Sequence, residues 1–200
     1  KQMISSGFSL NVKSTMRIES ELALTTNDLN TFSRIGSQDD QGFSNRSKLV
    51  QKIPMKKDQW QDLAVESYLE FEYLSSHFSP IEQYRKVEFD RDWNLTSTTG
   101  NQSLLVSGLH FSAPENGFAK YQFEKLDFSD SYSGSRHVFD ARYSYKKWLF
   151  QNNSSFLKSD GSYSTTSFAR SDSRVKYHWN KNWAGTRARW NNMAGDTWWN

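Results

Sequence analysis

Residues 9–26 alternate almost without interruption between two kinds of side chain. Apolar or small residues from Leu10 to Leu24 take the even positions, and charged or polar residues such as Arg17 take the odd ones. Successive side chains of a β-strand point to opposite faces, so the pattern predicts a strand with one apolar and one polar face. At ~3.3 Å per residue, a single strand of this length would extend far beyond the usual ~5–6 residues. Something other than a small sandwich core is needed to explain such a strand.

The same two-residue period returns along the rest of the chain. It covers residues 65–73, 87–95, 104–111, 118–128 and 138–150, and short hairpins follow to residue 190. The pair Asn116-Gly117 supplies the positive φ angles of a tight turn, which predicts that 104–111 and 118–128 pair antiparallel. Residues 36–48 are rich in Gly, Asp, Asn and Ser and are expected to form a polar loop. We expect one all-β unit over residues 1–200, part of a longer chain and built as an antiparallel meander of long strands.

Aromatic residues make up 16% of the chain, although its mean hydropathy is only -0.83. A soluble β-sandwich fills its interior with branched aliphatic residues, whereas large aromatics beside Ser, Thr and Ala suit a membrane interface or a sugar. The meander is therefore expected to be an outer-membrane β-barrel or a segment of one. The aromatics expected at a membrane interface, or stacked on a ligand, are Tyr143, Tyr145, Trp148, Tyr177, Trp179, Trp183 and Trp190.

The charged residues divide along the chain. From Ser135 onward there are 11 Lys and Arg against 4 Asp and Glu, and before it 14 against 18. If the sheet closes, acidic strands from the middle and basic strands from the end would form opposing walls of one polar compartment. The residues expected on this lumen face are Glu66, Glu70, Glu72, Glu88, Asp90, Asp92, Arg142, Lys146, Arg174, Lys176, Arg187 and Arg189.

Motifs for catalysis are absent from the sequence. There is no Cys, the four His residues are far apart, and neither a Walker loop nor a dinucleotide fingerprint occurs. Glu88, Asp90 and Asp92 could bind Ca²⁺, but a solvated strand face explains them better. The basic residues near the C-terminus alternate with apolar ones, which suits a lumen or a glycolipid surface more than nucleic acid. We expect no enzyme activity, no metal and no cofactor.

Three segments resemble parts of large outer-membrane or surface β-proteins of Bacteroidetes-type bacteria. They are YRKVEFDRDWNL at residues 84–95, the hairpin containing NGFAKYQFE, and SYSGSRH at residues 131–137. The resemblance implies a location in the bacterial outer membrane, with outer-membrane lipid or lipopolysaccharide and other envelope proteins as partners. It implies no functional residue and no substrate.

Two functions follow as hypotheses. The first is a non-catalytic outer-membrane β-barrel component with a role in a pore, in transport or in assembly and secretion. The second is a secreted or periplasmic β-sandwich that recognises carbohydrate through exposed Trp and Tyr side chains. Extraction behaviour separates them, because only the first requires detergent.

Overall fold

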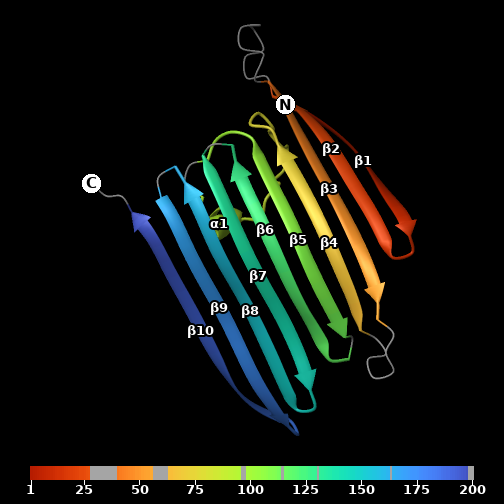
Figure 1. Cartoon of the computed structure of the whole chain (residues 1–200), viewed down its shortest axis with the longest axis vertical. Helices are drawn as coiled ribbons and strands as arrows, with labels where there is room; N and C mark the ends of the chain where they lie inside the picture. The colour runs from red at the N-terminus through yellow and green to blue at the C-terminus, as the bar shows by residue number, and fades with distance from the viewer. Residues whose placement is uncertain are drawn as a thin grey trace.

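The computed structural model describes residues 1–27, 40–55, 63–95, 98–113, 115–129, 131–162 and 164–197. Within these residues the chain forms one ten-stranded sheet in the order β1 to β10, with every neighbouring pair antiparallel (Figure 1). The strands are β1 Gln2–Lys13, β2 Met16–Thr26, β3 Gln41–Pro54, β4 Ala64–Leu74, β5 Gln102–Ala113, β6 Gly117–Phe128, β7 Tyr132–Tyr145, β8 Trp148–Gly161, β9 Ser164–Trp179 and β10 Asn182–Thr197. The predicted all-β antiparallel meander is confirmed.

The expectation of one long strand over residues 9–26 is wrong. The segment lies in two strands, β1 and β2, which are joined by a turn at Ser14-Thr15. Leu10 pairs with Ile18, so even-numbered side chains share a face on both strands. The alternation therefore passes through the turn without a change of phase. The turn also lacks the Gly or Asn that would signal it.

The strand expected at residues 87–95 is also wrong, because Phe89–Trp93 forms the short helix α1 in the connection from β4 to β5. The helix ends at Asn94, whose φ of 52° is left-handed. Phe89 and Trp93 are four residues apart, so they share one side of a helix, and their ring centroids are 6.3 Å apart. In so short a segment, apolar residues at even spacing fit a strand and a helix equally well.

The polar loop expected at residues 36–48 is wrong for its second half, since β3 begins at Gln41. Residues 36–39 lie outside the described residues. Gly42 is required for packing here, because a Cβ atom at this position would lie 2.3 Å from the Cα atom of Phe78. Gly42 thus allows the connection after β4 to pass directly over β3.

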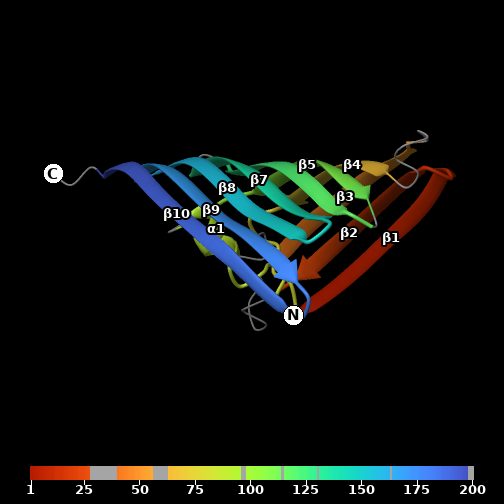
Figure 2. The same ribbon diagram turned by 90° about the horizontal axis from the view of Figure 1, so that it is seen from below.

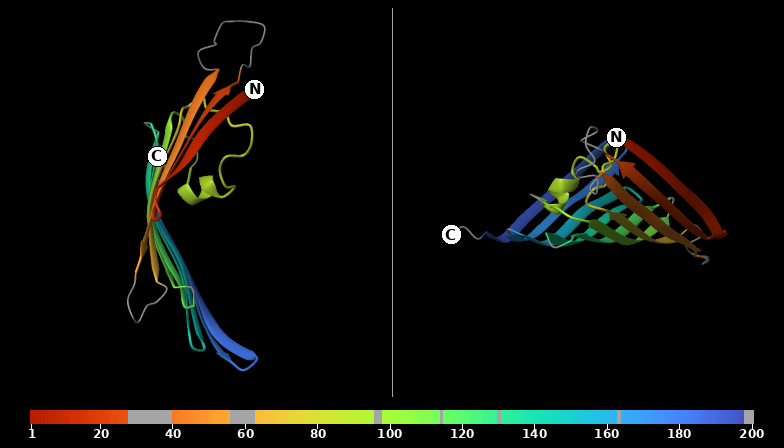
Figure 3. Two further views of the ribbon diagram at one scale, coloured as in Figure 1. Left: turned by 90° about the vertical axis from the view of Figure 1, so that its right-hand side faces the viewer. Right: turned by 90° about the horizontal axis from the view of Figure 1, so that it is seen from above.

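The sheet is curved and open, and its two faces differ in chemistry. The register places Glu70, Arg136 and Arg174 on one face, which we call the polar face, and Phe156 and Trp148 on the other, the apolar face. The polar face is concave, and α1 lies against it (Figures 2 and 3). In the described part of the chain, β1 and β10 each have one unpaired edge.

The main buried cluster lies on the polar face. Trp93 of α1 packs there with Leu126, Tyr132 and Leu157 of β6, β7 and β8. The large side chains of the apolar face remain exposed, with Phe8 at 61% and Phe156 at 49%. The fold therefore buries its core on the side of the sheet that carries the charges.

Candidate functional site

The strand residues predicted for a lumen share the polar face. The register brings together Glu66, Glu70, Glu72, Arg142, Arg174, Lys176, Arg187 and Arg189 on this face. The other four predicted residues lie elsewhere. Lys146 is in the turn between β7 and β8 with its Nζ 5.2 Å from the Tyr145 ring centroid, Glu88 precedes α1, and Asp90 and Asp92 belong to α1 and not to a strand.

Residues 75–95, which we call the inward segment, are attached to β4 through Glu72. The Glu72 side chain is only 6% exposed. Its carboxylate accepts a 2.7 Å hydrogen bond from the Tyr84 hydroxyl and pairs with the Arg85 guanidinium. The Arg85 guanidinium also lies 4.5 Å from the Phe89 ring centroid. Glu72 is therefore a buried anchor for the segment and not a free charge on a wall.

A second anchor joins α1 to the far side of the sheet through Asp92. Its carboxylate lies 3.2 Å from Arg136 Nη1 on β7 and 3.3 Å from Arg170 Nη2 on β9. Arg136 also donates a 2.7 Å hydrogen bond from Nε to Glu124 on β6, and its guanidinium lies 5.1 Å from the Trp93 ring centroid. Asp92 thus bridges two strands that are not neighbours.

The third anchor is the buried cluster around Trp93, which is 1% exposed. The Tyr132 hydroxyl donates a 2.5 Å hydrogen bond to the backbone carbonyl of Trp93. Asn94 Nδ2 donates to Thr166 Oγ1 at 3.1 Å, which adds a contact to β9. Together the three anchors hold the inward segment across the polar face from β4 to β9.

The inward segment encloses a hollow of about 610 Å³ against the polar face. Tyr68, His110, Lys120 and Gln122 line its floor. The Tyr68 hydroxyl donates to Gln122 Oε1 at 2.7 Å, and Lys120 Nζ lies 5.4 Å from the Tyr68 ring centroid. These groups present hydrogen-bond donors and acceptors to whatever fills the hollow, so the site suits a polar occupant.

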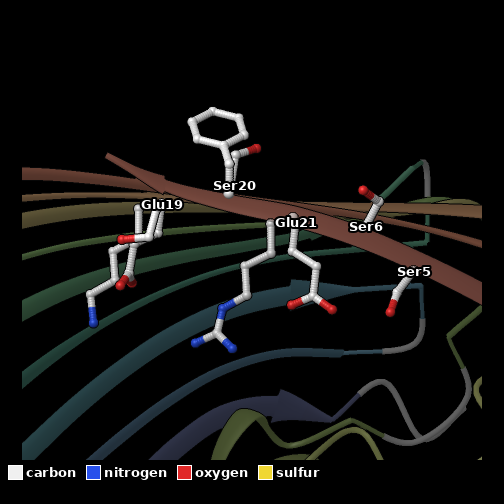
Figure 4. A pocket seen from close by; sticks show the side chains of 10 residues that line it. Ser5, Ser6, Glu19, Ser20 and Glu21 are labelled. Carbon is white, nitrogen blue, oxygen red and sulfur yellow. The ribbon is translucent and has the colours of Figure 1, made fainter. Parts of the chain in front are cut away.

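A second hollow of about 530 Å³ lies over β1 to β3 (Figure 4). Glu19 and Glu21 point to its interior side, whereas Ser20 points to the other face of the sheet (Figure 4). Arg46 and Lys48 line both hollows. The two hollows therefore adjoin on the polar face at β3.

The predicted aromatic residues gather at one end of the apolar face, with two exceptions. The Trp148 and Tyr177 ring centroids are 4.8 Å apart, and Trp179 stacks on Tyr177 at 6.1 Å. Tyr143 and Tyr145 precede the adjacent turn on the same face. The exceptions are Trp190, which is in the middle of β10, and Trp183, which lies on the polar face with its ring centroid 4.8 Å from Lys176 Nζ.

Polar side chains on the apolar face bond to one another. Asn152 Nδ2 donates to Ser173 Oγ at 2.8 Å, and Ser154 Oγ donates to Asn152 Oδ1 at 2.9 Å. Ser154 and Ser171 hydroxyls are also 2.9 Å apart. Such pairing lowers the free energy of placing these groups in an apolar medium. No sequence pattern indicated this network, because its members come from two strands.

Alkaline pH should loosen the inward segment through Tyr84. Partial burial and the hydrogen bond to Glu72 raise the pKa of Tyr84 above its usual value of 10. A raised pKa stabilises the folded state below about pH 10, and that contribution is lost as the pH rises further. We expect protease cleavage within residues 75–95 to increase above about pH 10 in the wild type. Tyr84→Phe, which cannot ionise, should show a smaller increase, and identical pH profiles would exclude Tyr84 as the cause.

Comparisons with known proteins identify no relative, since no family model, no curated protein and no solved structure matches this chain. Among the described residues, no group of His, Cys, Asp and Glu is arranged to hold a metal ion. Within the described part of the chain, no helix is long and apolar enough to cross a membrane.

Proposed function

We propose that this chain forms part of the wall of an outer-membrane β-barrel. The barrel has no catalytic activity and works as a pore, in transport, or in assembly and secretion at the cell envelope. One observation carries the proposal. The inward segment and the buried cluster lie on the polar face, while the apolar face of the sheet is exposed.

The exposed apolar face argues against water as its surroundings. Soluble monomers rarely expose contiguous apolar patches larger than a few hundred Å². The large side chains exposed on this face span the sheet from β1 to β10 and include Ile4, Phe8, Leu24, Leu69, Phe71, Phe111, Phe139, Phe156 and Trp190. In a soluble fold, a segment such as residues 75–95 would cover this face. Apolar-out and polar-in alternation is the arrangement of membrane barrels.

Strand length and connection length support the same proposal. Every strand has 11 to 16 residues, and a tilted strand crosses the hydrocarbon layer with ~9–11. The two longest intervals between strands follow β2 and β4, and both of these strands end at the same end of the sheet (Figure 1). Membrane barrels have short turns at one end and longer loops at the other. The aromatic row at Trp148 and Tyr177 lies at the end opposite these long connections.

The unpaired edges of β1 and β10 are part of the proposal. Backbone groups at an open edge cannot remain unpaired in lipid, so the sheet must close by pairing with further strands. Lipid or lipopolysaccharide would then contact the apolar face, and water would fill the polar face around the inward segment. The solute itself is not defined by this argument.

Extraction behaviour tests the proposal. The chain should sediment with membranes, stay there through a high-salt wash, and enter solution only with detergent. A variant tests the apolar face directly. Changing both Phe150 and Phe156, which are exposed on β8, to Ser should weaken membrane retention. A wild-type chain that is monomeric in buffer without detergent would overturn the proposal and favour the secreted carbohydrate-binding module.

A further inference from the structure

The polar face of β9 and β10 carries an excess of positive charge. Among the described side chains of this face, only one is a carboxylate, Asp172, whereas five are cationic. The cationic residues are Arg170, Arg174, Lys176, Arg187 and Arg189. Arg174 and Arg187 are directly opposite each other in the register. Like charges in this position destabilise a sheet. An anion bound between these side chains would therefore stabilise this part of the sheet.

Acidic residues elsewhere on this face do not supply that anion. Four of them are paired with other cations, Glu66 with Lys52, Glu70 with Arg46, Glu72 with Arg85 and Glu124 with Arg136. Two more, Glu21 and Asp140, lie on β2 and β7, which are not neighbours of β9 or β10 in the sheet. The three strand carboxylates of the acidic wall expected from the sequence, Glu66, Glu70 and Glu72, are consequently neutralised by these partners. The basic wall keeps most of its charge.

Asp172 lies at the centre of the arginine cluster formed by Arg174, Arg187 and Arg189. Arg187 donates from Nε to Asp172 Oδ1 at 2.8 Å, and the Nε atoms of Arg174 and Arg189 are each 3.5 Å from the same carboxylate. One carboxylate leaves two of the three positive charges uncompensated. Each guanidinium has five N–H donors, and the three side chains are 37% to 61% exposed, so free donors face solvent.

We propose that this arginine cluster binds soluble multivalent oxyanions, such as solutes that carry phosphate or carboxylate groups. Guanidinium forks match the geometry of these oxygens and can hold them in pairs. Lys176 and the ring of Trp183 lie beside the cluster and extend the site. The site rests on the proposed function in one respect, since it takes the polar face as the wall of a water-filled passage.

Binding of tripolyphosphate to the detergent-solubilised chain tests the site directly. At about 0.1 M salt, where the Debye length is about 10 Å, distant charges contribute little. We expect Arg174→Gln combined with Arg187→Gln to weaken binding by about tenfold, through loss of charge-assisted hydrogen bonds. The matched control is Arg17→Gln combined with Lys52→Gln, which removes the same charge from β2 and β3 and should change the Kd by no more than about twofold.

Asp172→Asn gives an effect of opposite sign. Removing the carboxylate that competes for the arginines should tighten tripolyphosphate binding several-fold. Weaker binding in Asp172→Asn, or equal losses in the two double variants, would overturn the site. Binding of the wild type to vesicles containing phosphatidylglycerol, without binding of tripolyphosphate, would assign the cluster to a lipid surface and also contradict the proposal.

Failure of the two proposals is distinguishable. Planar bilayers report whether the chain forms a conducting passage, and the binding assay does not depend on insertion. Anion binding without insertion would leave the site standing and overturn the membrane function. If the chain conducts but the two double variants bind tripolyphosphate equally well, the membrane function stands and the anion site is overturned.

Discussion

Replacing Trp93 by Ala is expected to release the inward segment and to lower the free energy of unfolding by about 3–5 kcal/mol. Trp93 is the most deeply buried large side chain of the inward segment, and it packs in one cluster with side chains of β6, β7 and β8. Its loss would also remove the ring beneath Arg136, which holds Asp92. Urea unfolding in detergent micelles measures the free energy, and limited proteolysis within residues 75–95 measures release of the segment.

Trp190→Ala is the matched control for this prediction. Trp190 is 52% exposed on the apolar face, so its removal leaves no cavity. We expect a smaller loss in micelles than for Trp93→Ala, because no cavity is created, and no new cleavage in the inward segment. If Trp93→Ala keeps the segment protected from protease, the segment is held by its charged anchors and the buried cluster is dispensable.

Phe156→Arg is expected to make folding into lipid vesicles less favourable by about 2–4 kcal/mol. Phe156 lies near the middle of β8 on the apolar face, where a charge would be placed in hydrocarbon if the proposed function holds. The measurement is reversible unfolding by urea in vesicles, compared with the wild type.

Asn153→Arg tests whether the effect comes from the face and not from the added charge. Asn153 is exposed on the same strand, three residues away, but on the polar face. We expect little change in the free energy of folding for this variant. Equal tolerance of Arg at both positions would mean that the two faces meet the same medium, and it would remove the basis for a membrane wall.

Local patterns in the sequence predicted the parts of the fold that depend on local chemistry. The antiparallel pairing of β5 with β6 is confirmed, and Gly117 has a φ of 135° that few other residues adopt. The expected positive φ at Asn116 is wrong, because the turn precedes Gly117, which begins β6. The alternation also assigned Glu70 and Arg174 to one face before any strand was paired. Side-chain direction within a strand needs only the period of two.

Contacts between distant segments could not be predicted in this way. Arg85 and Tyr84 were not identified as partners of Glu72, and Asp92 was assigned to a strand face although it bridges Arg136 and Arg170. These pairs form because the connection after β4 folds back over strands that come later in the chain. The spacing of residues within 84–95 does not indicate that this segment folds back over those strands.

The alternating directions of the ten strands set a rule of parity for closure. Each neighbour in the sheet is antiparallel to the last, so β1 and β10 run in opposite directions. A ring that stays antiparallel throughout can then accept only an even number of strands between β10 and β1. The smallest unit that can be inserted or removed is therefore a whole hairpin. A variant shortened by a single terminal strand would present two edges of the same direction, and its ring would have to contain a parallel pair.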